Sequence, residues 1–284
     1  MAKLPGQGRQ ESGLPLGTYL EENLQALQRL YHHTEDLVIR RFRLGLSAEQ
    51  AAAVVYLQGN VDENAIARQV IEPLARGSVE FTLEPDGPVH EMEPIQEYFV
   101  SAAAARLLDR LSETSPPLAA GAVALFVDGI PEALILSLPT NDIGRSVAEP
   151  ESSPVVRGSR EGFVENLERN LALLRSRIQT PALRVKYVSL GKRTHTRVAV
   201  LYLQGVAEEA TVQEVVTRLE RIDIDGVLES GYIEEFLRDN PYTVFPTVQA
   251  TERVDITCGN LLEGRIAIVT DGTPFVLSAP VSLP

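Results

Sequence analysis

Two segments decide the fold of this chain: AVVYLQG at residues 53–59 and VAVLYLQG at residues 198–205. Each is a continuous apolar run, rich in β-branched residues, that ends at a glycine, which is typical of a buried β-strand followed by a turn. Their tyrosines, Tyr56 and Tyr202, are 146 residues apart. An internal repeat would determine the architecture of the whole chain, so we next ask whether the segments that flank these two also repeat.

The flanking segments repeat at nearly the same spacing. LVIRRFRLG at 37–45 aligns with LRVKYVSLG at 183–191, and their final glycines are again 146 residues apart. AVALFVDGIP at 122–131 matches RIAIVTDGTP at 265–274, with 143 residues between the two aspartates. Three segments in the same order indicate an internal duplication. The alternative is two unrelated α/β domains with similar strand composition.

Helices are predicted before and between these strands in both halves. Thr18 and Glu21 form a capping-box pattern before an amphipathic helix, whose counterpart spans about 161–177. A second amphipathic helix follows the strands in each half, and we expect Pro73 to kink or shorten the first copy. Pro94 opens a predicted helix that runs on through YFVSAAAARLLDRL.

The dipeptides Asp128-Gly129 and Asp271-Gly272 each lie between two apolar runs. This pattern predicts tight hairpins in which both central turn residues have positive φ. Helices that alternate with strands and hairpins indicate mixed sheets covered by helices. The predicted fold class is therefore α/β, with two similar α/β subdomains, each a mixed β-sheet covered by helices, that arose by internal duplication.

Composition divides the chain into four parts. We expect a disordered tail at 1–18, a first α/β subdomain at 19–140 and a second at 161–284. The segment 141–160 between them is rich in Pro, Ser, Gly and charged residues and is the predicted linker.

The overall composition excludes several classes of protein. The 284 residues are 44% hydrophobic, as in a soluble globular protein, and the net charge of −13 disfavours general binding to nucleic acid or to an anionic membrane. The single cysteine, Cys258, rules out an internal disulfide or a multi-thiolate metal site. No apolar stretch approaches the roughly 20 residues of a membrane helix, so we expect a soluble polypeptide.

No catalytic motif is present, and we expect no cofactor and no metal. His32 and His33 close a predicted helix, where a cation is favourable in itself, and His195 lies in a polar loop. Cys258 falls in an apolar helical stretch and is interpreted as a small buried hydrophobe rather than a nucleophile. An enzyme is therefore disfavoured.

The acidic stretch at 223–239 lacks the alternating ligands of a calcium loop. We interpret it as a turn followed by a solvated helix that places Ile233, Phe236 and Leu237 inward.

Charge is distributed unevenly along the second half. Residues 157–197 contain ten basic and three acidic side chains. One interpretation is that they pair with the acidic region at 207–263 within the same domain. The other is a basic face that meets an acidic partner or anionic lipid head groups. The candidates for that face are Arg184, Lys186, Lys192 and Arg193.

The second half also resembles a known family over residues 155–281. The runs that carry the likeness are VVRGSREGFVENLERNLALLRSRI, RIDIDGVLESGYIEEFLRDNPYTVFPTVQATERVD and LLEGRIAIVTDGTPFVLSAPV. They are similar to the amino-terminal region of the A subunit of spore germinant receptors, the GerA family.

The resemblance implies a setting and partners. The A subunit is a membrane protein with a region on the cytoplasmic, spore-core face of the spore inner membrane. It works with B and C subunits to detect small-molecule germinants, as an oligomeric ion channel. The chain stops at APVSLP, where membrane segments would begin, so we expect an excised soluble domain.

Among the family-like positions, Glu252, Arg253 and Arg265 are not required by strands and turns. They are interpreted either as a buried ion pair or as residues that line the surface between the two subdomains. Together with Tyr232 and Asn240 they are the candidates for a ligand site or subdomain interface.

The resulting functional hypothesis is a non-enzymatic sensory and coupling domain of a germinant receptor A subunit, with small-molecule binding between the subdomains. The alternative is a structural assembly module of a germination-related ion channel subunit with no ligand of its own. A paralogous sporulation channel subunit is a further variant within the family. Nucleic acid is not an expected partner of any of these.

Overall fold

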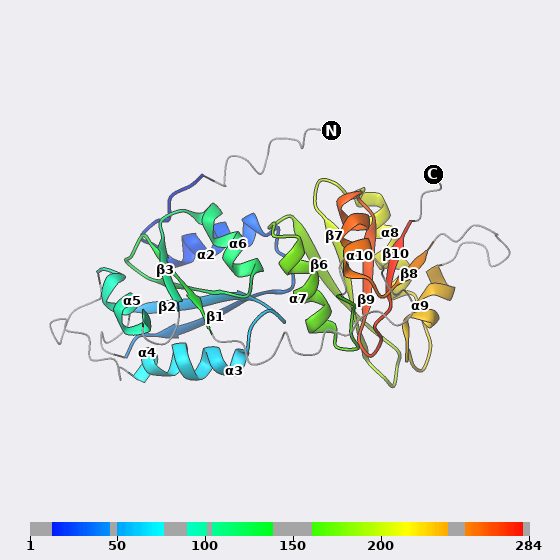
Figure 1. Cartoon of the computed structure of the whole chain (residues 1–284), viewed down its shortest axis with the longest axis horizontal. Helices are drawn as coiled ribbons and strands as arrows, with labels where there is room; N and C mark the ends of the chain where they lie inside the picture. The colour runs from blue at the N-terminus through cyan, green and yellow to red at the C-terminus, as the bar shows by residue number, and fades with distance from the viewer. Residues whose placement is uncertain are drawn as a thin grey trace. The chain divides into compact units, whose positions relative to one another are not determined.

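The structure is a computed structural model of the chain and describes residues 13–45, 50–76, 90–100, 104–138, 161–237 and 248–280. The chain divides into two compact units (Figure 1). The first unit is built mainly from Pro5–Asp142, and the second from Ile143–Ile178 and Ala182–Pro284. The predicted linker at 141–160 and most of the predicted tail lie outside the described residues, and the predicted domain limits stay predictions.

The two units contain corresponding elements in the same order. The first consists of α2 (Leu20–Leu30), β1 (Leu37–Arg43), β2 (Ala51–Leu57), α3 (Glu63–Ile66), η1 (Ala67–Ile71), α4 (Glu72–Arg76), α5 (Glu93–Val100), β3 (Ala104–Leu108), η2 (Leu111–Thr114), α6 (Ser115–Ala119), β4 (Val123–Val127) and β5 (Ala133–Ser137). The second consists of α7 (Leu167–Arg177), β6 (Leu183–Leu190), β7 (Thr196–Leu203), α8 (Glu209–Glu220), α9 (Ser230–Leu237), β8 (Gln249–Thr251), α10 (Val254–Leu262), β9 (Ile266–Thr270) and β10 (Val276–Ala279).

Each unit forms one five-stranded sheet, and the two sheets have equivalent strand orders. These orders are β1-β2-β4-β5-β3 and β6-β7-β9-β10-β8. The prediction of two similar α/β subdomains is therefore confirmed, and the shared topology is that of a duplicated fold.

The sheets differ from the prediction in one respect, because every described strand pairing is antiparallel rather than mixed. The reason is the position of the hairpins. The β4–β5 hairpin lies between β2 and β3, and the β9–β10 hairpin lies between β7 and β8. As a result, β3 and β8, which each follow a helical segment, lie at the edge of their sheets. There β3 pairs with β5 and β8 pairs with β10, in both cases antiparallel.

Helices cover both faces of the first sheet (Figure 1). Along β2, alternate residues contribute to two separate cores: Ala53 and Val55 to the core under α2 and α6, and Val54 and Tyr56 to the core under α3, α4 and α5. A strand buried on both faces needs apolar residues at every position. This is why the segments that decide the fold are continuous apolar runs.

The two Asp-Gly turns do not have the predicted geometry. The hairpins are present, but their connections span residues 128–132 and 271–275, and in each only the glycine has positive φ, at 89°. The aspartate instead serves a helix. Asp128 Oδ1 accepts a hydrogen bond of 2.9 Å from the Leu20 backbone N–H, and Asp271 Oδ1 accepts one of 3.1 Å from Leu167.

The glycine of each turn completes the same contact. The Gly129 N–H donates to the Thr18 carbonyl, and the Gly272 N–H donates to the Glu165 carbonyl, both at 2.7 Å. We call this pair of bonds the Asp-Gly clamp. It replaces the predicted capping box, because the N-cap of α2 is Tyr19, which makes no side-chain cap bond.

A buried asparagine holds the chain just before each of these helices. Asn23 accepts a hydrogen bond from the Gly17 N–H and donates to the Gly17 carbonyl, at 2.9 and 2.7 Å. Asn170 makes the same two bonds with Val164, at 2.8 and 2.6 Å. Both amides are buried, so each pair satisfies polar atoms that would otherwise destabilise the fold.

Two predicted helices differ from the structure. The helix that starts near Pro94 ends at Val100, and Ala104–Leu108 forms the edge strand β3, because pairing with β5 outweighs the helical propensity of the alanines. Before Pro73 the helix contains a π-helical turn in which the Glu72 N–H bonds to the Ala67 carbonyl. A proline cannot donate to the carbonyl four residues earlier, which accounts for this distortion.

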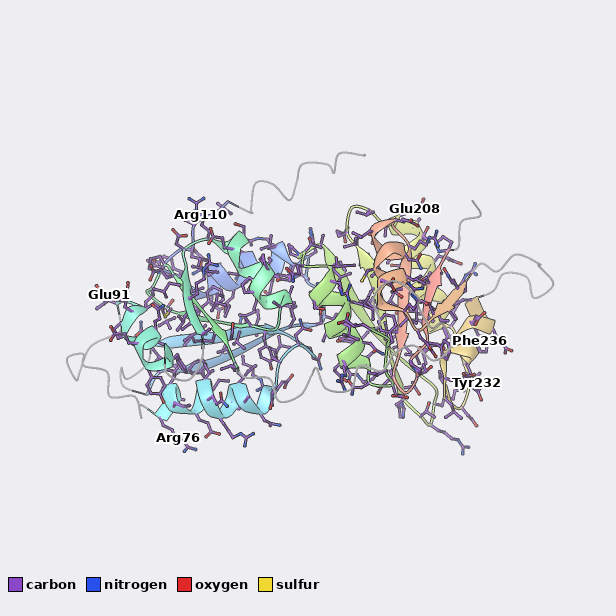
Figure 2. The ribbon with its side chains drawn as sticks, viewed as in Figure 1. Arg76, Glu91, Arg110, Glu208, Tyr232 and Phe236 are labelled. Carbon is purple, nitrogen blue, oxygen red and sulfur yellow. The ribbon has the colours of Figure 1, made fainter. Side chains whose placement is uncertain are left out.

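The helix in the acidic stretch forms as α9, but its inward face is smaller than predicted. Ile233 and Leu237 are buried, whereas Phe236 is 47% exposed. Figure 2 shows Phe236 and Tyr232 at the outer edge of the second unit.

We predict that Asp271→Ala lowers the free energy of unfolding of the second unit by about 1 kcal/mol, because it removes the acceptor at the start of α7. Asp271→Asn keeps an acceptor oxygen and should lose less. Urea denaturation followed by circular dichroism measures both. Gln213→Ala, an exposed substitution in the middle of α8, is the control, and an equal loss in this control would contradict a capping role for Asp271.

A second prediction concerns two glycines of the α10 region. Gly264 has φ of 88°, and an added Cβ would lie 2.9 Å from the Val206 carbonyl oxygen. Gly264→Ala should therefore destabilise the protein by about 2 kcal/mol. Gly259 lies within α10 with open space around it, so Gly259→Ala should stabilise by roughly 0.5–1 kcal/mol. Thermal unfolding of the two variants should shift in opposite directions.

Candidate functional site

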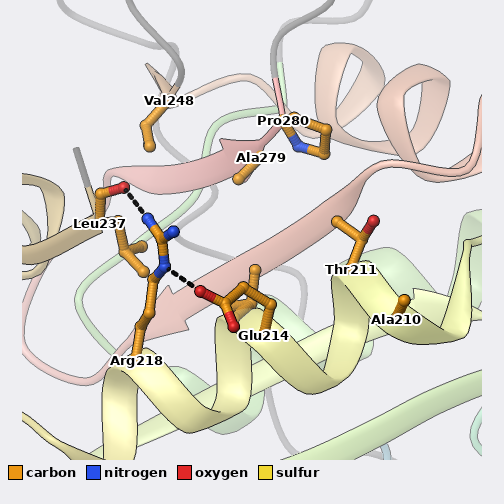
Figure 3. Close-up of a pocket in the computed structure, with 9 residues that line it drawn as sticks. Ala210, Thr211, Glu214, Arg218, Leu237, Val248, Ala279 and Pro280 are labelled. Atoms are coloured by element: carbon orange, nitrogen blue, oxygen red, sulfur yellow. Dashed lines mark hydrogen bonds and ion pairs between the residues drawn. The ribbon is translucent and has the colours of Figure 1, made fainter. Parts of the chain in front are cut away.

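The second unit contains a pocket with a volume of about 300 Å³ (Figure 3). One wall is the outer side of α8, and the opposite wall comes from the end of α9, the start of β8 and the end of β10. The lining residues are Ala210, Thr211, Glu214, Val215, Arg218, Leu237, Val248, Ala279 and Pro280.

The sequence of α8 explains why this wall faces the pocket. Val212, Val216 and Leu219 are buried in the core beneath the helix. Glu214 and Arg218 are four residues apart, so they lie one above the other on the same helical face. Their side chains form an ion pair with Nε and Oε1 2.7 Å apart.

Arg218 also joins two helices. Its Nη1 donates a hydrogen bond of 3.2 Å to the carbonyl oxygen of Leu237, the last residue of α9 (Figure 3). A carbonyl at a helix C-terminus lacks an intrahelical partner and carries partial negative charge, so it suits a guanidinium. The Glu214–Arg218–Leu237 arrangement thus fixes one side of the pocket.

The lining determines which molecules fit. The single acidic and single basic side chain neutralise each other, Thr211 adds a hydroxyl, and the remaining residues are apolar. Such a pocket suits a small, largely apolar molecule with one or two polar groups. A second hollow of about 230 Å³ shares Arg218 with the pocket and is otherwise lined by Arg221, Ile222 and Phe236.

Among the described residues that line this pocket, catalytic and metal-binding groups are not gathered together. Cys258 lies in α10, where burial raises the pKa of its thiol to about 11, so the reactive thiolate is scarce at neutral pH. Within the described ranges, no group of three or more His, Cys, Asp and Glu side chains is placed to hold a metal ion.

The predicted basic residues have partners within the second unit. Lys186 pairs with Glu220 at 3.8 Å, Lys192 with Asp223, and Arg193 with Asp225 at 3.6 Å, while Arg184 donates to Gln204 at 3.2 Å and stacks over Tyr202. These contacts agree with pairing inside one domain. Their role at a partner or membrane surface stays a prediction.

The candidates Glu252, Arg253 and Arg265 are held by local contacts. Arg253 forms a two-pronged ion pair with Asp255, at 3.1 and 2.6 Å, and this guanidinium lowers the pKa of the Asp255 carboxyl. Arg265 pairs with Glu263 at 3.1 Å, and Glu252 is buried. None of these three residues lines the pocket.

The other two candidates lie elsewhere. Tyr232 is on the exposed side of α9, and Asn240 lies outside the described residues. A ligand role for these five residues stays a prediction. Sequence reasoning missed Glu214 and Arg218, for which the only local signal was an oppositely charged pair at helical spacing.

Across the described part of the chain, no helix has both the length and the apolar character needed to span a membrane.

Comparisons with known proteins give a consistent result. A family described as "Bacillus/Clostridium GerA spore germination protein" matches residues 25–284. Spore germination protein KA of Bacillus subtilis (strain 168) is 37% identical over 96% of this chain and 49% of that protein. Spore germination protein B1 of the same strain is 34% identical over 93% of this chain and 53% of that protein. The chain thus spans about half the length of the curated relatives it matches.

A solved structure matches over nearly its whole length. It is the crystal structure of the N-terminal domain of the A subunit of the Bacillus megaterium spore germinant receptor GerK3. The TM-score is 0.74 at 35% identity, and the match covers 96% of this chain and 98% of that one. On the sequence match and on this shared fold, the chain belongs to the GerA family of spore germination proteins.

Proposed function

We propose that this chain is the sensory and coupling region of a spore germinant receptor A subunit and that it acts without a chemical reaction of its own. The observation that carries the proposal is the match, in extent as well as in fold, to the N-terminal domain of the GerK3 A subunit. In this role the region lies on the cytoplasmic, spore-core face of the inner membrane and works with receptor B and C subunits.

The proposed sensing site is the pocket beside α8. Its volume of about 300 Å³ and its largely apolar lining with one hydroxyl and one ion pair suit a small nutrient molecule. The site between the two units that the sequence favoured stays a prediction.

The geometry of the pocket supports a coupling role. Its walls belong to two different elements: α8 packs on the sheet through its valines, and Ala279 is the last residue of β10, paired with Ile266 in the sheet. A ligand that binds better to one separation of these walls shifts the population toward that separation. In this proposal the shift passes to the rest of the receptor through the elements that form the two walls.

We predict that Ala210→Phe in the full-length receptor impairs the nutrient response of spores. Ala210 is exposed at the edge of the pocket, so a phenyl ring there fills the space without disturbing the core. Loss of about 1.4 kcal/mol of binding would raise the nutrient concentration for half-maximal germination about tenfold. The fall in optical density of a spore suspension after nutrient addition measures this.

Gln213→Phe is the matched control, because Gln213 is exposed on the same helix but does not line the pocket. It should leave the response unchanged at equal receptor level. An unchanged response in Ala210→Phe would remove the pocket from the proposal. An unchanged response after deletion of the whole region would remove the coupling role itself.

A further inference from the structure

The outer side of α9 carries an unusual set of exposed apolar side chains. On α9, Tyr232 is 40% and Phe236 47% exposed, and Leu228, two residues before the helix begins, is 68% exposed. Tyr232 and Phe236 are four residues apart on α9 and therefore share a face, and Figure 2 shows both at the outer edge of the unit. Scattered exposed apolar residues are normal, but several within one short segment indicate an interaction site.

A hollow adjoins this cluster. It has a volume of about 230 Å³ and is lined by Phe236 together with Arg218, Arg221 and Ile222 from the end of α8 and the turn after it. A projecting aromatic ring beside a hollow of side-chain size is the arrangement that anchors a partner in protein interfaces. We call Leu228, Tyr232, Phe236 and this hollow the α9 surface.

The charges around the α9 surface point to the kind of partner. The acidic residues just before it are paired, since Glu220 contacts Lys186 and Asp223 contacts Lys192. By contrast, over the described ranges neither Glu229 nor Glu235 forms an ion pair, although both are exposed beside the apolar side chains. Arg221, which lines the hollow, is also exposed without an ion pair within these ranges, so the two carboxylates still leave this surface acidic by two charges to one. Such a surface complements apolar residues flanked by Lys or Arg.

The first unit provides an internal comparison. In α5, Ile95 and Phe99 are buried as Ile233 and Leu237 are in α9, so Tyr98 corresponds to Phe236. The positions that correspond to Leu228 and Tyr232 are His90 and Pro94. The duplicated fold therefore does not require an apolar outer face on this helix, and the feature is specific to the second unit.

From these observations we propose that the α9 surface is a docking site for an amphipathic segment of a partner protein that carries Lys or Arg beside its apolar residues. Phe236 and Tyr232 pack against the apolar side of the segment, and one of the segment's side chains enters the hollow. Glu229 and Glu235 form ion pairs with its Lys or Arg side chains. This interaction goes beyond nutrient sensing and does not depend on a ligand in the pocket.

The test uses two synthetic amphipathic helical peptides with the same leucine pattern, one with Lys and one with Glu on the polar positions. Fluorescence anisotropy at physiological salt measures their binding to the chain, and nuclear magnetic resonance shifts locate it. We expect the Lys peptide to bind at α9 and the Glu peptide not to bind.

Matched variants separate this site from general attraction to an acidic protein. Phe236→Ser should weaken binding of the Lys peptide by about tenfold or more, as expected for an interface anchor, whereas Tyr98→Ser should leave it unchanged. Glu235→Lys should weaken the Lys peptide and strengthen the Glu peptide. Circular dichroism of each variant checks that it is folded.

Three results would overturn the proposal. The first is equal binding of the Lys peptide to the Phe236→Ser and Tyr98→Ser variants. The second is a dimer of the chain in sedimentation that Phe236→Ser abolishes, since a second copy would then be the occupant. The third is binding to anionic vesicles that Phe236→Ser abolishes, since the surface would then serve a membrane.

Discussion

A hydrogen bond between a turn carboxylate and a helix N-terminus is the contact on which each unit depends. Asp128 and Asp271 follow a central strand, and each binds the first N–H of a helix more than 100 residues earlier in the chain. The carboxylate satisfies an N–H that has no intrahelical partner and lies at the positive end of the helix dipole. The Asp-Gly clamp thus fixes the helix and the central hairpin of each unit with respect to each other.

Because the clamp is present in both units, the first helix of each unit is held in the same way, and the units also differ on the opposite face of the sheet. There the first unit has a helix interrupted by a π-turn before Pro73, while the second has the uninterrupted α8. Both the pocket and the α9 surface lie on this face of the second unit. Duplication preserved the scaffold, and the features proposed to carry function lie where the two copies have diverged.

The sequence predicted the strands and their repetition because a strand buried on both faces leaves an unmistakable apolar run. The sequence did not predict the features that depend on contacts between residues distant in the chain. Residues Ala104–Leu108 became a strand because β5 offered a free edge, and the hairpins gave antiparallel neighbours throughout. The pocket was not predicted for the same reason: Glu214 and Arg218 are ordinary helix-surface residues until Leu237 and Pro280 are placed opposite them.

The two proposed sites share one residue, and this has a thermodynamic consequence. Arg218 lines both the pocket and the hollow, and its bond to the Leu237 carbonyl ties α8 to α9. An occupant of the pocket that displaces Arg218 would also change the lining of the hollow. Linkage requires that a partner at the α9 surface alter pocket affinity by the same factor. Arg218 is thus the residue through which the two proposed sites would be coupled, and the coupling is favourable only if both occupants stabilise the same α8–α9 arrangement.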